Sequence, residues 1–391
     1  MMQRYGAHLR SHFLLDERLC FLNHGSFGAC PKSVLEAQSA WRAQMERDPI
    51  RFMVRTLPEA LRAQAEELGE LLGARGEDVA FVENATTGVN SVLRGLELSA
   101  GDEILVLSHV YPAVNNTISY LAERHGCRVV RVALPVPLLS PDAVVEAVAA
   151  SLSPRTRIAV LDHVTSFSAA VLPVSSMIKR CHANGTPVLI DGAHAPGMIP
   201  LNLKELNADY YVGNCHKWLW APKGCAFLYA SPEVQGNLHP TAVSLREAEG
   251  FPFSFDWTGT KDPSAFLALG AALEFHNWLG GAAVADYNHT LVVSASEQLG
   301  ESLGWECPVP AHMTGSIRAL RIPGTDDATR EDAIALHDYL ADTHHIEVLV
   351  HAHDGLWVRL SAQVYNVLGD YAALLAALEL WERGRAGRLR L

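Results

Sequence analysis

Residues 187–197 read PVLIDGAHAPG, a short apolar run that ends in an acid, a glycine and a histidine. A run of this length, bounded by turn residues, is typical of a buried strand. The pattern therefore places Asp191 and His194 just beyond the carboxyl end of a strand. Taken alone, an acid in that position can also simply cap the next turn.

Strands of the same kind occur on both sides of this stretch, and helical patterns separate them. The strand-like runs are VAFV (79–82), EILVLS (103–108), RVVRVAL (128–134), RIAVLDHV (157–164), ADYYVGN (208–214) and CAFLYA (225–230). The helical patterns are TGVNSVLRGL (87–96), AVNNTISYLAERHG (113–126), DAVVEAVAASL (142–152) and SSMIKRCHANG (175–185). This alternation predicts an α/β fold with a mostly parallel sheet covered by helices on both faces. In such sheets, ligands bind at the carboxyl ends of the strands.

The C-terminal part of the chain has a different pattern. It contains a strand-like IRALRIP (317–323), a helical segment (329–345), two strands around an Asp-Gly turn (347–362) and a final helix (370–385). We therefore expect a large domain over residues 1–274, with a helix at 31–48, and a smaller α+β domain over residues 275–391. The polar and aromatic loop 239–266 is too long for a simple connection, so we expect a functional or interface role for it.

Composition narrows the class of protein. The 391 residues include 31 lysines and arginines against 43 aspartates and glutamates, for a formal net charge of -12 at pH 7. This balance argues against non-specific binding to nucleic acid or to an anionic membrane. Seven cysteines without a C-x-x-C pair fit a reducing compartment. Because neither a signal peptide nor an apolar run of ~18 residues is evident, we expect a cytoplasmic protein.

Two further strand ends carry groups suited to chemistry. NATTGVN (84–90) follows the first strand, and Thr86 and Thr87 open a helix there. Its N–H groups, hydroxyls and dipole can bind an anion, although a hydroxyl N-cap explains the pattern equally well. Lys217 follows another strand in apolar surroundings, where a lysine has a depressed pKa and acts as an amine nucleophile. The alternative is a lysine that snorkels over an aromatic surface.

The anion site, Asp191 and Lys217 are all expected at one edge of the sheet, and together they match the needs of one cofactor. Pyridoxal 5'-phosphate (PLP) has a phosphate that suits a helix amino end, a ring nitrogen that suits a carboxylate and an aldehyde that suits an amine. Each match is weak alone. Their joint occurrence predicts a PLP site.

The motifs DGAHAPG (191–197) and HKWLWAPKG (216–224) resemble those of the PLP-dependent class V aminotransferase superfamily of fold type I. LNHGSFG (22–28), together with NATTGVN and DGAHAPG, is most similar to the isopenicillin N epimerase-like branch. The resemblance extends from about residue 20 to residue 366. It implies a large PLP-binding domain with a mostly parallel mixed sheet, a smaller C-terminal domain and a homodimer with shared active sites.

The resemblance also implies roles for residues around the cofactor. Lys217 matches the Schiff-base lysine, Asp191 the acid paired with the pyridine nitrogen, and His194 the partner of the phenolic oxygen. Tyr111 in SHVYPAV matches the aromatic ring over the cofactor's face, with His109 as the less favoured match. The remaining cofactor positions are matched by Thr86, Thr87, His216 and Asn214 around the phosphate and by Ser166 beside the cofactor oxygen.

On the substrate side, Arg359 in WVRLSAQVYN matches the arginine whose planar fork binds the α-carboxylate. A strand arginine in a surface ion pair is the alternative. Asn366 is expected to support that pocket, and Asn23 and His24 resemble the substrate-side N-terminal loop of the branch. Thr260 resembles a residue that reaches the partner subunit's cofactor phosphate, which implies a homodimer.

Three other classes are disfavoured. A histidine-rich metal site is not predicted, because no cysteine or acidic ligand pattern accompanies His344, His345, His351 and His353. A sulfur-mobilising desulfurase would carry a cysteine on a loop shortly before the carboxylate arginine. Here the last cysteine, Cys307, lies far before Arg359 and in WECPVP. A non-catalytic PLP-fold protein would have little need to keep Lys217, Asp191 and Arg359 together.

The type of reaction depends on the step that comes after Lys217, acting as a base, has removed the Cα proton. Reprotonation at Cα gives epimerisation, loss of a β-leaving group gives a lyase, and reprotonation on the cofactor carbon gives transamination. The LNHGSFG branch favours an epimerase of an amino acid or an amino-acid-derived substrate. A C–S lyase is the alternative, followed by an aminotransferase. An epimerase also needs a proton donor opposite Lys217, for which Tyr111 and the Asn23–His24 loop are the candidates.

Overall fold

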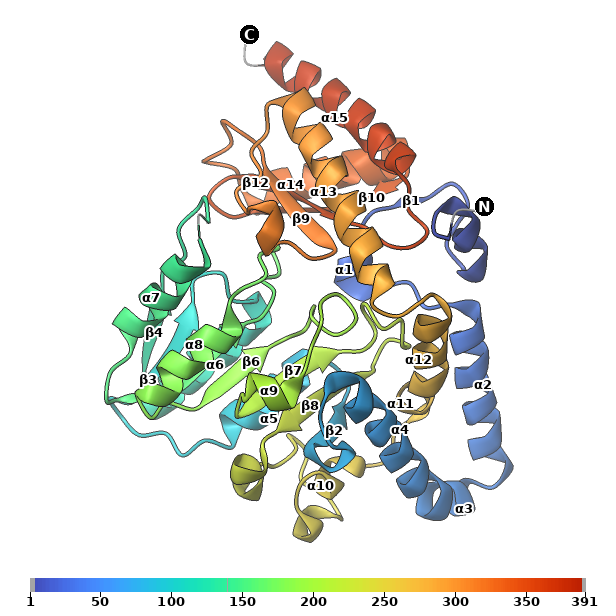
Figure 1. The fold of residues 1–391 in the computed structure, drawn as a ribbon, viewed down its shortest axis with the longest axis vertical. Coiled ribbons are helices and arrows are strands. Elements are labelled where there is room, and N and C mark those ends of the chain that lie inside the picture. Colours follow the sequence, from blue (N-terminus) through green and yellow to red (C-terminus); the bar gives the residue numbers. More distant parts are fainter. Residues whose placement is uncertain (1–3, 139, 389–391) are drawn as a thin grey trace.

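The computed structural model describes residues 4–138 and 140–388. Its centre is a seven-stranded sheet with the order β2-β8-β7-β6-β5-β3-β4 (Figure 1). The strands are β2 (Val79–Val82), β3 (Glu103–Leu107), β4 (Arg128–Val132), β5 (Thr156–Asp162), β6 (Val188–Asp191), β7 (Tyr210–Asn214) and β8 (Ala226–Ala230). β8 runs antiparallel to β2 and β7, while the other pairs are parallel. The predicted mixed, mostly parallel sheet is confirmed.

Helices cover both faces of this sheet. The connecting helices are α5 (Ala85–Arg94), α6 (Pro112–His125), α7 (Pro141–Ser151) and α8 (Val174–Ala183). Successive side chains of a strand point to opposite faces, so alternate residues of β5 enter different cores. Ile158 and Val160 pack with apolar residues of α5 and α6. Ala159 and Leu161 pack with those of α7 and α8.

A smaller antiparallel sheet lies in the C-terminal part, with the order β11-β12-β9. Its strands are β9 (Ile317–Arg321), β11 (Leu349–Ala352) and β12 (Leu356–Ser361), and the helices α13 (Ala283–Leu303), α14 (Arg330–Asp338) and α15 (Leu368–Arg388) bury apolar side chains against it. The predicted Asp-Gly turn is present, with φ of 46° at Asp354 and 116° at Gly355. The helix expected over 329–345 ends at Asp338 and continues as a π-helical turn, η7 (Tyr339–Thr343).

The N-terminal segment joins the two parts. β1 (Cys20–Phe21) pairs in parallel with β10 (Ile346–Glu347) of the C-terminal part. The helices α2 (Lys32–Arg47), α4 (Leu57–Leu72) and α12 (Leu269–Trp278) then lie together beside the central sheet (Figure 1). The proposed division of the chain between residues 274 and 275 stays a prediction.

Short helical segments complete the described chain. They are η1 (Ala7–His12), α1 (His24–Phe27), α3 (Pro49–Arg51), η2 (Phe52–Thr56), η3 (Gly76–Asp78), α9 (Leu203–Leu206), η4 (Pro232–Asn237), η5 (Glu247–Glu249), α10 (Phe253–Asp256), α11 (Ser264–Leu267) and η6 (Ala311–Met313). The loop 239–266 thus contains small helical turns. None of the helices in the described part of the chain combines the length and apolar character that crossing a bilayer requires.

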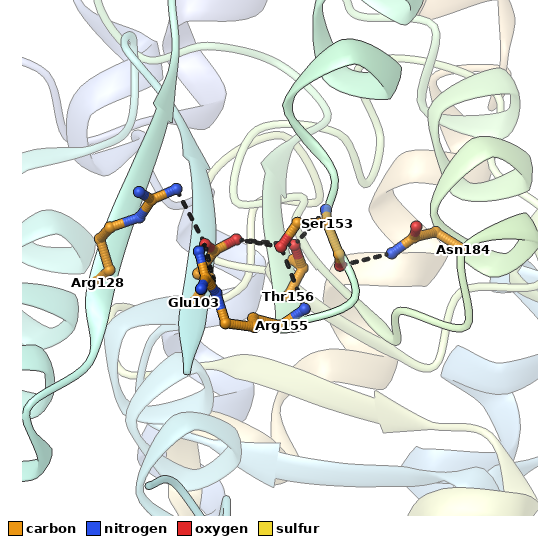
Figure 2. A network of polar contacts seen from close by, with 6 residues as sticks. All are labelled: Glu103, Arg128, Ser153, Arg155, Thr156 and Asn184. Atoms are coloured by element: carbon orange, nitrogen blue, oxygen red, sulfur yellow. Dashed lines mark hydrogen bonds and ion pairs between the residues drawn. The ribbon is translucent and has the colours of Figure 1, made fainter. Parts of the chain in front are cut away.

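A polar network ties together the amino ends of three strands (Figure 2). The carboxylate of Glu103, at the start of β3, accepts a hydrogen bond from the Ser153 hydroxyl at 2.6 Å. The same carboxylate pairs with Arg128 at 2.9 Å and with Arg155 at 3.1 Å. Asn184 after α8 donates to the Ser153 carbonyl at 3.0 Å. These contacts hold β3, β4 and β5 in register at the edge opposite their carboxyl ends.

Candidate active site

A cavity of about 530 Å³ opens at the carboxyl ends of the central strands. It is lined from the ends of β5, β6 and β7, from the amino ends of α5 and α6, and from α1. The predicted site residues that line it are Thr86, Tyr111, Ser166, Asp191, His194, Asn214, His216 and Lys217. The structure therefore brings these eight residues to one place, while their individual roles stay proposals.

Lys217 follows β7 and is only 9% exposed. Its Nζ lies 3.2 Å from Nε2 of His194. Burial lowers the pKa of Lys217 to about 7, and the positive charge of Arg359 acts in the same direction. An amine with such a pKa is partly neutral near neutral pH and can act as a nucleophile or a base. Because this side chain is buried, the alternative of a lysine that snorkels over an aromatic surface does not apply.

Asp191 ends β6, and His194 lies in the turn that follows. Burial raises the pKa of Asp191, and a hydrogen bond from the Ala193 N–H at 3.0 Å and the charge of Lys217 oppose that rise. Burial lowers the pKa of His194, so its ring is neutral. An imidazole that accepts from Lys217 through Nε2 carries its proton on Nδ1, which is buried without a partner. That donor suits an oxygen atom of a ligand.

The amino end of α5 forms one wall of the cavity. The Asn84 side chain caps the helix by accepting from the Thr87 N–H at 2.9 Å, and Oδ1 of Asn214 accepts from the Ala85 N–H at 2.9 Å. His216 donates through Nδ1 to a backbone carbonyl at 3.1 Å, which leaves Nε2 available to the cavity. The positive end of the helix dipole attracts anions, so this wall suits a phosphate group.

Tyr111 stands at the mouth of the cavity. It directly precedes α6 and is 44% exposed. His109, the less favoured match for the same role, is buried and hydrogen-bonded through Nδ1 to the Ser168 hydroxyl at 2.9 Å. Its ring packs against Phe167 and does not line the cavity. The structure thus places the Tyr111 ring, and not that of His109, at the cavity.

Arg359 is a buried cation beside the cavity. Its Nη1 donates to the Ser166 carbonyl at 2.6 Å and its Nη2 to the Ser26 hydroxyl at 3.3 Å, and both serines line the cavity. None of its hydrogen bonds reaches a carboxylate, and its Nε is buried without a partner. Burial lowers its pKa to about 10, which still leaves it charged at neutral pH. A buried cation without a counter-ion suits a carboxylate ligand.

None of the four predicted substrate-side residues lines the cavity: Arg359 contacts two serines of its wall, while Asn23, His24 and Asn366 are bonded elsewhere. His24 donates through Nε2 to the Lys217 carbonyl at 3.0 Å and accepts through Nδ1 from the Tyr365 hydroxyl at 2.8 Å. Nδ2 of Asn23 donates to Glu347 at 2.9 Å, and Nδ2 of Asn366 donates to the Phe21 carbonyl at 3.1 Å. These contacts anchor the N-terminal loop and the backbone of Lys217.

Thr87 and Thr260 do not line the main cavity. Both line a neighbouring cavity of about 230 Å³. Thr260 is exposed, and the next residue, Lys261, forms an ion pair with Glu83 at 2.6 Å. Glu83 lines both cavities, so this ion pair holds the loop that carries Thr260 beside the main cavity.

Ser26, Phe27 and Asp162 are among the cavity-lining residues to which sequence reasoning assigned no role. Asp162 ends β5 and is paired with Asp191 of β6 in the parallel ladder. The signal was present in the sequence, because RIAVLDHV ends in an acid just as VLIDGAH does. Ser26 and Phe27 belong to the LNHGSFG motif, in which the sequence instead indicated Asn23 and His24 as the substrate-side residues.

These side chains fit PLP. A buried amine with a lowered pKa suits the aldehyde, a buried carboxylate suits the ring nitrogen, and the α5 amino end suits the phosphate. The unpartnered Nδ1 of His194 suits the phenolic oxygen. By contrast, the described part of the chain contains no group of three or more His, Cys, Asp or Glu side chains placed to hold a metal ion.

The sequence matches the family model described as aminotransferase class-V over residues 28–350. It is 35% identical over 395 residues to isopenicillin N epimerase of Amycolatopsis lactamdurans, which covers 95% of this chain and 98% of that protein. It is 32% identical over 410 residues to putative L-cysteine desulfhydrase 1 of Oryza sativa subsp. japonica, with coverages of 95% and 85%.

Among solved structures, the cystine C-S lyase C-DES in complex with cysteine persulfide has a TM-score of 0.78 and 22% identity, covering 93% of this chain and 97% of that one. This likeness confirms the predicted fold. The family-model match, over most of the chain, confirms the predicted superfamily and its cofactor. The chain therefore belongs to the class V aminotransferase family of PLP-dependent enzymes, and it is similar both to isopenicillin N epimerases and to cysteine desulfhydrases.

Proposed function

We propose that this enzyme cleaves the Cβ–S bond of a cysteine-type amino acid and is thus a PLP-dependent C–S lyase. In the simplest case L-cysteine and water yield sulfide, ammonia and pyruvate. The observation that carries this proposal is that Lys217 is a buried amine with a lowered pKa, while His24 and Asn23 are held by internal hydrogen bonds. Elimination needs one well-placed base, and this site offers one.

In this reaction, substrate binding and proton transfer are carried out by different residues. Arg359, with the Ser26 and Ser166 groups beside it, binds the α-carboxylate and fixes the amino acid in the cavity. Nζ of Lys217 takes the Cα proton. The Cβ–S bonding electrons leave on sulfur, and the same Nζ returns a proton to the departing thiolate. When bound, PLP supplies the electron sink that makes the Cα proton acidic.

The contacts of the N-terminal loop weigh against the epimerase that the sequence favoured. An epimerase must return a proton to Cα from the face opposite Lys217. Both ring nitrogens of His24 are already hydrogen-bonded, and the ring is fully buried. Burial lowers the pKa of His24 to about 3, so the ring carries no proton to spare at neutral pH. Asn23 is engaged with Glu347 and has no acidic proton.

Epimerisation is the second candidate because of Tyr111. Its hydroxyl is a proton donor at the mouth of the cavity, and the isopenicillin N epimerase of Amycolatopsis lactamdurans is 35% identical to this chain. A variant separates the two candidates, since Tyr111→Phe keeps the aromatic ring and removes only the hydroxyl. If Tyr111 is the second acid, the Tyr111→Phe variant should lose epimerase activity, while its elimination activity should change far less.

The test is incubation of the holoenzyme in deuterated water with L- and D-amino acids and S-substituted cysteines. We expect release of a thiol together with pyruvate that carries deuterium on its β-carbon. Deuterium at Cα of both recovered enantiomers, without keto acid, would instead establish an epimerase. Keto acid that forms only when a second keto acid is supplied would indicate an aminotransferase.

We further propose that the enzyme is a homodimer in which Thr260 contacts the partner subunit's cofactor phosphate. Thr260 is exposed, and the ion pair between Lys261 and Glu83 holds its loop next to the phosphate-binding wall. Exposed apolar side chains in the same loop, Val243 and Leu245, support an interface role. The cytoplasmic location expected from the composition stays a prediction.

A further inference from the structure

Two carboxyl groups lie side by side at the cavity. Asp162 and Asp191 end the neighbouring parallel strands β5 and β6 and are paired in the ladder. Both line the cavity, and they are only 3% and 5% exposed. Because paired residues of adjacent strands point to the same face of a sheet, the two side chains approach the same part of the cavity.

The two acids differ in their surroundings. Oδ1 of Asp191 accepts a hydrogen bond from the Ala193 N–H at 3.0 Å, and the charge of Lys217 favours its ionised form. Oδ2 of Asp162 is buried without a hydrogen-bond partner. Burial raises the pKa of Asp162 well above its ordinary value, and the neighbouring Asp191 raises it further. Two adjacent buried carboxyl groups cannot both ionise at low cost, so a shared proton belongs on Asp162.

We propose that Asp162 is a positioning residue that stays a neutral acid and thereby holds Asp191 as the carboxylate that a cationic ring nitrogen requires. As a neutral acid, Asp162 can donate a hydrogen bond toward Asp191. Such a bond stabilises the ionised form of Asp191 and lowers its tendency to take the proton of the ring nitrogen. This role concerns cofactor binding alone and is the same for a lyase, an epimerase or an aminotransferase.

The other titratable groups around Asp162 do not supply a competing charge. They are His163 directly after β5, Tyr211 of β7, His194 after β6, His109 after β3, and Lys217 after β7. His163 and Tyr211 are hydrogen-bonded to each other at 2.9 Å, and burial holds His163, His194 and His109 neutral by lowering their pKa values. Lys217 lies 3.2 Å from His194 and acts on Asp191.

The first test measures the thermal stability of the PLP-free protein from about pH 5 to 9. The pKa of an aspartic acid in the unfolded chain is about 4. If its pKa in the folded state is higher, the folded state loses stability as pH rises from the unfolded pKa to the folded pKa. Asp162→Asn cannot ionise, so its midpoint should exceed the wild-type midpoint by a margin that is smallest near pH 5 and grows toward pH 9. The control Asp142→Asn changes an exposed acid at the start of α7, and its difference from wild type should not vary over this range.

The second test measures PLP affinity by titrating the PLP-free variants. Asp162→Asn keeps a neutral donor of the same shape, so its dissociation constant should stay within about three-fold of wild type. Asp162→Ala removes the donor and should weaken binding by about ten-fold or more. Asp191→Asn, which removes the counter-charge itself, should weaken binding at least as much.

Two outcomes would overturn the proposal. One is a stability difference for Asp162→Asn that does not change with pH. The other is a loss of PLP affinity in Asp162→Asn as large as in Asp191→Asn, because the ionised form of Asp162 would then be the one that matters. A measurement on the unmodified chain covers the case in which the variants fail to fold. The PLP-free wild type should show the infrared C=O stretch of a protonated carboxylic acid at neutral pH, and its absence would equally refute the proposal.

Discussion

Lys217 shows how burial makes a common side chain reactive. The ammonium form of a lysine is strongly hydrated in water, and this hydration is lost when the side chain is buried. Its pKa therefore falls to about 7, helped by Arg359 and opposed by Asp191. Lys223, in the Pro-Lys-Gly turn, lines the same cavity but is exposed. The two lysines form a natural pair for comparison.

Replacing Lys217 by alanine should abolish covalent attachment of PLP and all chemistry at Cα. The measurement is reduction of the holoenzyme with borohydride, followed by mapping of the labelled residue. Lys223→Ala is the control and should keep both the label at Lys217 and the visible absorption of the bound cofactor. A reducible linkage that persisted in Lys217→Ala would assign the attachment to another lysine.

Replacing Arg359 by lysine should weaken binding of α-amino acids by about 1.5–3 kcal/mol, or roughly ten- to a hundred-fold. The charge remains, but the planar fork that can hold two carboxylate oxygens is lost. Arg318→Lys is the matched control, because Arg318 is also a buried strand arginine but bonds to Ser296 and Glu297 instead. Equal substrate affinities for Arg359→Lys and wild type would place the carboxylate pocket elsewhere.

At the scale of elements, the N-terminal loop braces the segment that carries Lys217. His24 of α1 donates to the Lys217 carbonyl. Gly28, with φ of 72°, lies so close that an added Cβ would be 2.3 Å from the His216 carbonyl oxygen. Glycine tolerates both this backbone conformation and the close approach. The LNHGSFG motif thus has a structural role in addition to lining the cavity through Ser26 and Phe27.

His24→Phe should lower the free energy of unfolding by about 1–3 kcal/mol, since it leaves the Lys217 carbonyl and the Tyr365 hydroxyl without their partner. We also expect slower turnover, because the lysine backbone is less firmly held. Tyr365→Phe removes only one of these bonds and should have a smaller effect. A double-mutant cycle in urea denaturation should give strong coupling between the two sites, and additive effects would contradict the proposed brace.

The network around Glu103 offers a test at the opposite edge of the sheet. Glu103→Gln should cost about 1–3 kcal/mol of unfolding free energy without changing PLP binding. The Ser153 hydrogen bond and the nearby arginines lower the pKa of Glu103. Its contribution is therefore present above the unfolded pKa and disappears as pH falls through the lowered folded value. Glu146→Gln, which breaks an exposed ion pair with Arg180, should cost only about 0–1 kcal/mol.

For the whole molecule, the proposed sharing of active sites between subunits can be tested with hybrid dimers. Lys217→Ala and Thr260→Arg should each inactivate the homodimer. In a hybrid of the two, one site contains both defects and the other contains neither, provided that Thr260 acts across the interface. Random mixing of subunits should then restore activity to about a quarter of the sites. No recovery on mixing, or a monomer that binds PLP tightly, would refute the shared site.

The order of strands and helices and part of the cavity could be predicted from local pattern. Apolar runs such as VAFV and PVLI mark buried strands because burial on both faces excludes polar residues. Parallel strands end at a common edge, so Asp191, Lys217 and the threonines of α5 were expected together although 131 positions separate Thr86 from Lys217. Motif resemblance then supplied the family, which no hydrophobic pattern could indicate.

Tertiary contacts decided which side chains reach the cavity. His24 is fully bonded to groups 193 and 341 positions away, so it braces the lysine rather than lining the cavity. Asp162 stands beside Asp191 only because β5 and β6 pair in a particular register. Burial, hydrogen-bond partners and shifted pKa values arise from atoms that are distant in sequence, and no local pattern encodes those distances. The strand ends were therefore readable from the sequence, whereas the protonation states that the chemistry needs emerged only when the chain was folded.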